Sequence, residues 1–315
     1  MPLNIAIVGL GKITQDQHIP SIKANPAFRL VAVASLRGLA VEGVPHAFKD
    51  HRAMLASVAD LDAVAICTPP QPRHAIARDA LAAGKHVLLE KPPAATLSEL
   101  VDLKSAAEAA GKTLFTTWHA QYNAGVEAAR ERLAGRSVTR LSVTWKEDVR
   151  VWHPGQEWIW QAGGFGVFDP GINALSIVTR ILPEPVFVKR ADLSFPANRD
   201  APIAADLAFG SAAGASAGDA DLTAAFDWRQ TGEQSWDIAV QTADGMRLLL
   251  EKGGSRLAVD GKVVVDQAPA EYPRIYERFA ALVRDGRSEV DEAPFRLVAD
   301  AFMIGRRIVV EPFAS

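Results

Sequence analysis

Residues 4–14 read NIAIVGLGKIT, an apolar β-branched run that ends at Gly9 and Gly11. A strand followed at once by a Gly-x-Gly turn and a helix is typical of a dinucleotide-binding fingerprint. Gly9 permits the tight turn, and Gly11 lets the backbone approach a pyrophosphate at the helix N-terminus. Thr14 stands where the fingerprint has its third glycine, so the following helix is expected to pack slightly less closely. The motif alone is a weak indication of cofactor binding, and it requires a surrounding βαβ unit to support it.

After this motif, short β-branched segments alternate with amphipathic segments of helix length. Strands are expected at residues 4–9, 29–35, 63–67, 86–90 and 113–117, and helices at 19–25, 51–59, 73–83 and 97–110. This alternation is typical of βαβ units around a parallel sheet. Gly84 and Gly111 stand where a glycine ends a helix before the next strand. Residues 1–120 are therefore predicted to form an N-terminal, Rossmann-type doubly wound domain that binds a dinucleotide.

Beyond residue 120 the pattern changes to longer segments of alternating polarity. After a helix at 125–133, strands are expected at 139–147, 186–195, 222–228 and 236–242. Alternation indicates an antiparallel sheet with one buried face. We interpret 211–219 as a loop, Gly253-Gly254 and Asp260-Gly261 as hairpin turns, and 272–285 and 296–309 as closing helices. Residues 121–315 are predicted to form an α+β domain with a large open, mainly antiparallel sheet, for substrate binding and oligomerisation.

The composition argues against several classes of protein. With Lys+Arg 34 against Asp+Glu 37, the chain has no basic surplus to neutralise a phosphate backbone, so no nucleic-acid partner is expected. No apolar run approaches the roughly 18 residues that a membrane span needs. The N-terminus lacks the features of a signal peptide. A single cysteine, Cys67, cannot form an internal disulfide. We expect a soluble, cytoplasmic protein whose partner is a small molecule.

The end of the second strand bears on the choice between NAD and NADP. An NAD site usually has Asp or Glu here, whereas this chain has Ser35 and Arg37. A hydroxyl and a guanidinium suit a 2′-phosphate, because Arg makes charge-assisted, bidentate bonds to it. NADP is therefore the predicted cofactor, with NAD as a second option, and the alternative for Arg37 is a solvated loop cation.

Further cofactor contacts are expected at the fingerprint and at the carboxyl ends of the third and fourth strands. They are Gly9, Gly11, Lys12, Ile13, Cys67, Thr68, Pro69, Pro70, Glu90 and Lys91. The proline pair holds the turn after the third strand rigid beside the cofactor. Cys67 itself is expected to be a small buried hydrophobe without chemistry.

The fourth strand ends in Glu90-Lys91-Pro92, preceded by ALAAGKHV at residues 80–87. This pattern resembles the glucose-fructose oxidoreductase, inositol dehydrogenase and rhizopine-catabolism (GFO/IDH/MocA) family, over essentially the whole chain. The resemblance implies that Lys91 reaches both the nicotinamide ribose and the substrate hydroxyls, and that the bond before Pro92 is cis. A lysine at this position also lies where doubly wound sheets bind ligands. The family's frequent histidine of the Thr-Pro region is replaced here by Arg73.

The second motif of the family is an Asp followed four residues later by a His on a helix. Residues 163–173 read GGFGVFDPGIN, so Asp169 matches and Asn173 replaces the His. The i, i+4 spacing places both side chains on one helical face. Because Asn cannot take a proton, the base must be Asp169, Lys91 or the two coupled. The resemblance thus implies Lys91, Asp169 and Asn173 as catalytic residues.

Residues 145–150, 152–160 and 169–173 look like the corresponding segments of bacterial L-arabinose/D-galactose 1-dehydrogenases. This resemblance implies an NAD(P)-dependent aldose 1-dehydrogenase that oxidises L-arabinose, D-galactose or both at C1 to the aldono-lactone by hydride transfer. The alternatives are another dehydrogenase of the family, acting on an inositol, D-glucose or D-xylose, a reductase running toward the alcohol, and a non-catalytic NADP-binding regulator.

Aromatic rings stack on sugar C–H faces, while carboxylates and imidazoles bond to sugar hydroxyls. The sugar-binding candidates are His119, Glu147, Trp152 and His153. For Glu147 and His153 the alternative is a surface polar residue on a loop, and Trp145 is expected to pack within its strand. No metal is predicted, since the spacing of these residues matches no compact zinc signature. The family and the long alternating strands allow a homodimer through the C-terminal sheet.

Overall fold

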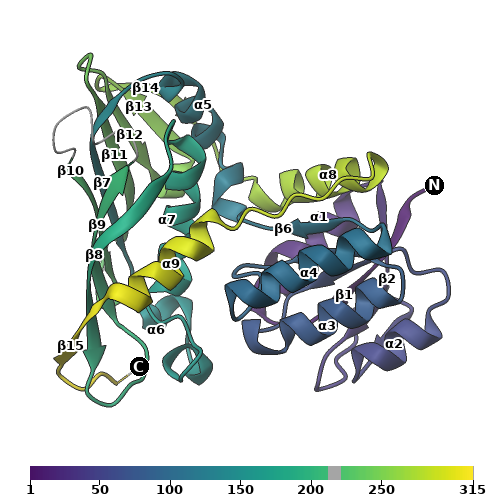
Figure 1. Cartoon of the computed structure of the whole chain (residues 1–315). Helices are drawn as coiled ribbons and strands as arrows, with labels where there is room; N and C mark the ends of the chain where they lie inside the picture. Colours follow the sequence, from purple (N-terminus) through teal and green to yellow (C-terminus); the bar gives the residue numbers. More distant parts are fainter. Residues whose placement is uncertain (212–220, 315) are drawn as a thin grey trace. The chain divides into compact units, whose positions relative to one another are not determined.

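The computed structural model describes residues 1–211 and 221–314 (Figure 1). The loop that we expected at 211–219 lies outside these residues from 212 onward. Contacts divide the chain into two compact units. The first unit comprises Met1–His119 and Ala270–Glu292, and the second comprises Ala120–Pro269 and Ala293–Ser315. Residues 270–292 thus pack with the first unit by contact, whereas the division predicted from the sequence placed them in residues 121–315.

The first unit is built on a parallel six-stranded sheet of order β3-β2-β1-β4-β5-β6. Its strands are β1 (Leu3–Val8), β2 (Phe28–Ala34), β3 (His46–Phe48), β4 (Ala63–Ile66), β5 (His86–Leu89) and β6 (Leu114–Thr116). Ile5, Ile7 and Leu88 have no exposed surface, as expected of strands covered on both faces. The doubly wound parallel sheet is confirmed. The short edge strand β3 was not predicted, because its mostly exposed residues show no apolar pattern.

Helices α3 and α4 pack together on one face of this sheet, and α1 packs with α8 (Figure 1). The helices are α1 (Ile19–Ala24), α2 (His51–Ser57), α3 (Pro70–Ala82), α4 (Leu97–Ala110) and α8 (Glu271–Arg284), with a π-helical turn at Thr14–His18 before α1. Thr96 and Glu99 form a capping box at the start of α4, and Gly111 ends it at φ 61°. These local signals explain why its predicted bounds agree with the structure.

Helix α8 belongs to the first unit through an aromatic core. Phe279 is fully buried and stacks between Phe28 and Phe115, with ring centroids 5.9 and 6.1 Å away. Tyr272 and Tyr276 on the same helix are also buried. These contacts join residues far apart in the sequence, so no local pattern could have predicted them.

The second unit contains a nine-stranded sheet of order β14-β13-β12-β11-β7-β10-β9-β8-β15. Its strands are β7 (Val138–Lys146), β8 (Val186–Pro196), β9 (Ala204–Ser211), β10 (Asp221–Asp227), β11 (Ser235–Thr242), β12 (Arg247–Glu251), β13 (Arg256–Val259), β14 (Lys262–Asp266) and β15 (Arg306–Val310). The pairs β10–β7 and β15–β8 are parallel, and the other pairs are antiparallel. Burial alternates along β10, which confirms the mainly antiparallel sheet with one buried face.

The last predicted helix, 296–309, is wrong in its second half. Helix α9 (Ala293–Ile304) ends before Gly305, and residues Arg306–Val310 form β15, which pairs with β8. A Cβ at Gly305 would lie 2.4 Å from the Ala301 carbonyl oxygen and 2.7 Å from Leu193 Cδ1. Close packing of the backbone against β8 therefore requires glycine here, and the β-branched run after it continues as a strand.

The remaining helical segments of the second unit are α5 (Ala124–Leu133), α6 (Val149–Trp152) and α7 (Phe168–Ile181), with short 3₁₀ turns at Glu157–Trp160 and Lys252–Gly254. A further 3₁₀ turn, His119–Tyr122, begins at the last residue of the first unit's N-terminal segment. Helices α5, α7 and α9 lie on one face of the sheet (Figure 1). Gly171 lets α7 approach the sheet, since a Cβ there would lie 3.0 Å from the Phe226 ring. Within the described residues, no helix has the length and apolar character required to span a membrane.

Candidate active site

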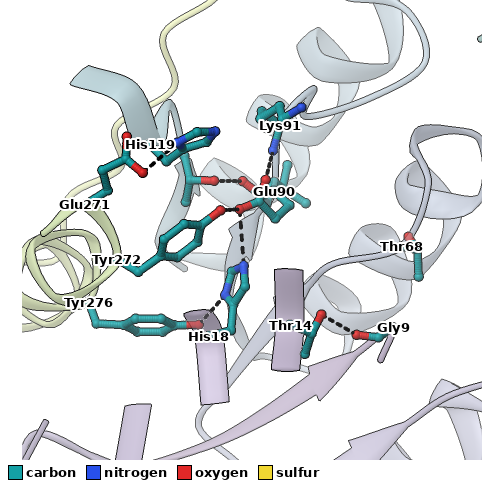
Figure 2. Close-up of polar contacts among 12 residues, drawn as sticks. Gly9, Thr14, His18, Thr68, Glu90, Lys91, His119, Glu271, Tyr272 and Tyr276 are labelled. Atoms are coloured by element: carbon teal, nitrogen blue, oxygen red, sulfur yellow. Dashed lines mark hydrogen bonds and ion pairs between the residues drawn. The ribbon is translucent and has the colours of Figure 1, made fainter. Parts of the chain in front are cut away.

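The turn after β1 packs directly on the chain that leaves β4. Gly9 has φ +99°, and a Cβ there would lie 2.8 Å from the Cys67 carbonyl carbon, so only glycine fits. At Gly11, in contrast, no atom would lie within 4 Å of an added Cβ. The hydroxyl of buried Thr14 donates a 2.9 Å hydrogen bond to the Gly9 carbonyl (Figure 2). The threonine thus fastens the turn, and the open backbone at Gly11 fits a cofactor diphosphate.

Ser35 and Arg37, which are predicted to favour NADP over NAD, follow the end of β2. Ser35 Oγ accepts a 3.0 Å hydrogen bond from the Leu39 amide, which shapes the turn. Arg37 is exposed, and none of the described carboxylates forms an ion pair with it. Its guanidinium is therefore accessible to an anion, as a 2′-phosphate requires. Lys12 pairs with Asp16 on the surface, and Ile13 is 41% exposed.

The residues after β4 form a second loop at the same edge of the sheet. Cys67 is half-buried, which corrects the expectation of a buried side chain, because it stands one residue beyond the end of β4. The Thr68 hydroxyl is buried and has no hydrogen-bond partner among the described residues. Pro69 is exposed, whereas Pro70 is buried at the first position of α3. Cofactor contacts by these four residues stay a prediction.

Glu90, at the end of β5, lies at the centre of a buried hydrogen-bond network (Figure 2). Its Oε1 accepts a 2.7 Å hydrogen bond from the Tyr272 hydroxyl and lies 3.1 Å from His18 Nε2. Its Oε2 accepts a 2.7 Å hydrogen bond from the Lys91 amide. On the other side of the His18 ring, Nδ1 is 2.7 Å from the Tyr276 hydroxyl. The bond Lys91-Pro92 is cis, which confirms the expectation from the family.

Glu90 and His18 form a buried ion pair. Burial raises the pKa of Glu90, but the hydrogen bond and charge of His18 outweigh it, so this pKa lies well below its ordinary value. Burial lowers the pKa of His18, but interactions with Cys67, Tyr276 and Glu90 outweigh it, so this pKa is well above its ordinary value. These opposite shifts favour the charged form of both groups.

His119 lies beside this network in the first unit. Its Nδ1 is 3.1 Å from Glu271 Oε2, and its ring stacks on Tyr272 at 5.8 Å between centroids (Figure 2). Burial lowers the pKa of His119, but the charge and hydrogen bond of Glu271 raise it, and the net shift is upward. Sequence reasoning missed Glu271, because α8 is remote in the chain. Sugar binding by His119 stays a prediction.

In the second unit, Asp169 lies in the first turn of α7 and is buried. His153 Nε2, from the loop after α6, lies 3.4 Å from Asp169 Oδ2. One turn further along α7, the Asn173 Oδ1 is buried and has no hydrogen-bond partner in the described part of the chain. In this chain the imidazole near Asp169 therefore comes from His153, in another segment. The family motif instead has its histidine on the same helix, at the position that Asn173 occupies here.

Glu147 is buried, and each of its carboxylate oxygens accepts a hydrogen bond from an indole. Oε1 accepts from Trp228 Nε1 at 3.2 Å, and Oε2 accepts from Trp236 Nε1 at 3.0 Å. Trp152 is 44% exposed and lies edge-on to Trp236, with centroids 5.6 Å apart. The His153 ring lies 5.3 Å from Trp228. The alternative interpretation of Glu147 as a polar surface residue on a loop is therefore wrong.

These contacts join four predicted residues and two further tryptophans into one group, which we call the aromatic cluster. Its members are Glu147, Trp152, His153, Asp169, Trp228 and Trp236. Sequence reasoning missed the two tryptophans because they stand at the ends of predicted strands, where they look like core residues. Trp145 is buried within β7, as expected. Among the described residues, no group of three or more His, Cys, Asp and Glu side chains is arranged to hold a metal ion.

Comparison with known proteins identifies the family of the chain. Residues 3–118 match the GFO/IDH/MocA oxidoreductase family, which has an NAD-binding Rossmann fold. The chain is 44% identical over 315 residues to the galactose 1-dehydrogenase of Pseudomonas fluorescens, with 99% of each chain covered.

Solved structures are similar over the same length. The D-galactose-1-dehydrogenase protein from Rhizobium etli is 55% identical, with a TM-score of 0.93 over 99% of this chain and 98% of that one. A 3-ketoreductase from Actinomadura kijaniata, solved with TDP-benzene and NADP, is 18% identical and shares the fold at a TM-score of 0.84, over 98% of this chain and 100% of that one. On the full-length identity, the chain belongs to the GFO/IDH/MocA family of oxidoreductases.

Proposed function

We propose that the protein is a nicotinamide-dependent aldose 1-dehydrogenase that oxidises D-galactose and L-arabinose at C1 to the aldono-lactone. The observation that carries this proposal is the full-length similarity to two galactose 1-dehydrogenases. The aromatic cluster supports it, since it combines a sugar-stacking ring with buried hydrogen-bonding groups. β-L-Arabinopyranose is D-galactopyranose without the exocyclic hydroxymethyl group. A difference of that size changes specificity by only about 1–3 kcal/mol, so we expect a pocket that reads the shared hydroxyls to accept both sugars.

In this proposal Asp169 accepts the proton of the anomeric hydroxyl while the C1 hydrogen leaves as hydride. The bound nicotinamide supplies the hydride acceptor. Lys91 stabilises negative charge that develops on the C1 oxygen. Asn173 orients the same hydroxyl through its side-chain amide.

The remaining candidates bind the sugar. Trp152 offers an exposed ring to the C–H face, and Glu147, His153 and His119 bond to ring hydroxyls. His153 Nε2, 3.4 Å from Asp169 Oδ2, also orients this carboxylate before the proton transfer.

The first test is a panel of initial rates of NADPH formation with D-galactose, L-arabinose, D-xylose, D-glucose and myo-inositol, repeated with NAD. We expect turnover confined to the first two sugars and faster with NADP. Turnover with inositol alone would replace the proposed substrate class. No turnover with any of the five would favour a non-catalytic regulator.

The preference for NADP rests on Arg37. Replacing Arg37 with Gln removes a charge-assisted bond to the 2′-phosphate, a bond of about 1.5–3 kcal/mol. We expect kcat/KM for NADP to fall about 10- to 100-fold, while kcat/KM for NAD, which lacks this phosphate, changes less than twofold. Steady-state kinetics with both cofactors measures this. An equal loss with both would contradict the role of Arg37.

Substitution of Glu147 is expected to affect the two tryptophans that donate hydrogen bonds to it, Trp228 and Trp236. The change Glu147→Ala leaves two indole N–H groups without their acceptor, at about 1–3 kcal/mol each. We expect the KM for D-galactose to rise at least tenfold and the tryptophan fluorescence spectrum to shift. The matched control is Glu131→Ala, an exposed residue of α5 in the same unit. An unchanged KM would argue against sugar binding by this cluster.

We also propose a homodimer through the sheet of the second unit. Exposed apolar side chains on its strands support this, namely Phe187, Leu249, Val263 and Val264. Light scattering across a concentration series tests it, with twice the chain mass expected and a constant monomer mass contradicting it.

A further inference from the structure

Arg73 is a buried cation that the proposed mechanism does not use. It lies on α3 and is only 3% exposed. Its Nη1 donates hydrogen bonds to the carbonyl oxygens of Glu90 and Pro92, the two residues that flank Lys91. Its Nη2 donates to the Thr68 carbonyl, on the loop after β4. One side chain thus ties together the loops that leave two neighbouring strands.

The chemistry of arginine explains why this residue type stands here. A guanidinium carries five donors in a rigid planar fork, so it can hold three carbonyl groups at once. Burying it costs several kcal/mol unless its donors are satisfied. A lysine ammonium is a compact point charge on a flexible stem, and a histidine has two ring nitrogens. The three donors of lysine share a single nitrogen and histidine has only two donors, so neither reproduces three bonds that come from two separate nitrogens of Arg73.

The Lys91 backbone is held from its other side as well. Its amide donates to Glu90 Oε2, and the Glu90 carboxylate is itself held by His18 and Tyr272 (Figure 2). The peptide group before Lys91 and the peptide group after Pro92 therefore both have fixed partners.

We propose that Arg73 is a positioning residue, which holds the Lys91 backbone so that the ammonium is correctly placed for substrate. Placement errors near 1 Å cost about 100-fold in rate, which sets the size of the expected effect. This inference rests on the proposed function, because it concerns the same reaction. Arg73 itself touches neither the sugar nor the reacting atoms in this proposal.

The first test is a double-mutant cycle of Arg73→Ala with Lys91→Met. If Arg73 acts through Lys91, the change at Arg73 lowers kcat about 100-fold in the wild-type background. It lowers the residual kcat of the Lys91→Met variant less than threefold, with small changes in KM in both backgrounds. Equal losses in both backgrounds would overturn the proposal. Arg73→His, which restores the residue usual in the family, and Arg73→Lys are expected to lose kcat as well.

The second test does not depend on turnover. Hydrogen exchange followed by mass spectrometry on peptides covering 86–96 is expected to be at least tenfold faster in Arg73→His than in wild type, while peptides within α4 stay unchanged. The matched control is Arg78→Ala on the same helix, where the side chain is 49% exposed and its ion pair with Asp102 spans 3.6 Å. It should leave both exchange and kcat unchanged. Unchanged exchange in Arg73→His would overturn the proposal.

The two tests separate this inference from the proposed function. Wild-type protein without turnover on any sugar would refute the function, and the exchange experiment would still decide whether Arg73 holds the Lys91 segment. An active wild-type enzyme with equal losses in the two backgrounds would refute only the role of Arg73.

Discussion

Replacing Asp169 with Asn is expected to lower kcat for D-galactose by about 10³-fold, with little change in KM. The substitution keeps the size and the hydrogen bonds of the side chain but removes the group that accepts the proton, and general base catalysis contributes about 10²–10⁴-fold. Because the base acts in the transition state, kcat and kcat/KM should fall together. Steady-state rates with saturating NADP measure this.

The matched control for this variant is Asp206→Asn, an exposed carboxylate on β9 in the same unit. It should retain wild-type kcat. An Asp169→Asn enzyme with near-normal kcat would show that another group accepts the proton. A loss of kcat in the double variant Asp169→Asn, His153→Gln would then identify His153 as that group. His153 is a titratable neighbour of Asp169, with Nε2 3.4 Å from Asp169 Oδ2.

Replacing Glu90 with Gln is expected to lower the free energy of unfolding by about 3–5 kcal/mol, the largest stability effect that we expect from a single substitution. Removing one partner of a buried ion pair leaves the other charge, here on His18, uncompensated. Urea unfolding followed by circular dichroism measures the change. Glu108→Gln, an exposed carboxylate on α4 in the same unit, should change it by less than 0.5 kcal/mol, about the usual limit for a surface substitution.

The effect of the Glu90 substitution should also depend on pH. Glu90 has a lowered pKa, so its contribution to stability is present above its unfolded pKa, about 4.3, and declines as the pH falls below that value. His18 has a raised pKa, so its contribution is complete below about 6.5 and is lost as the pH rises through the folded value. The difference between wild type and Glu90→Gln is therefore expected to be largest between about pH 4.5 and 6.5. A difference that is constant from pH 3.5 to 9 would contradict a charged pair.

Much of the first unit could be predicted from the chain because its signals are local. The apolar run before Gly9 and the strand-helix alternation after it define a parallel sheet, and Gly111 marks the end of α4. The second unit was harder. Strand β9 (Ala204–Ser211) has no β-branched residue and was not predicted, and β15 was predicted as helix because Gly305 acts through its packing on Leu193.

The candidate site divides in the same way. Motifs with a defined spacing placed Lys91 at the end of β5 and Asp169 one helical turn before Asn173. The partners of these residues come from elsewhere in the chain: Tyr272 bonds to Glu90 across 182 positions, and Trp236 bonds to Glu147 across 89. Hydrogen bonds of that kind form only after the chain has folded, because they depend on which helices and strands pack together. Periodicity and motifs determined the fold class and the residue types of the chemistry, and tertiary packing decided which groups hold them in place.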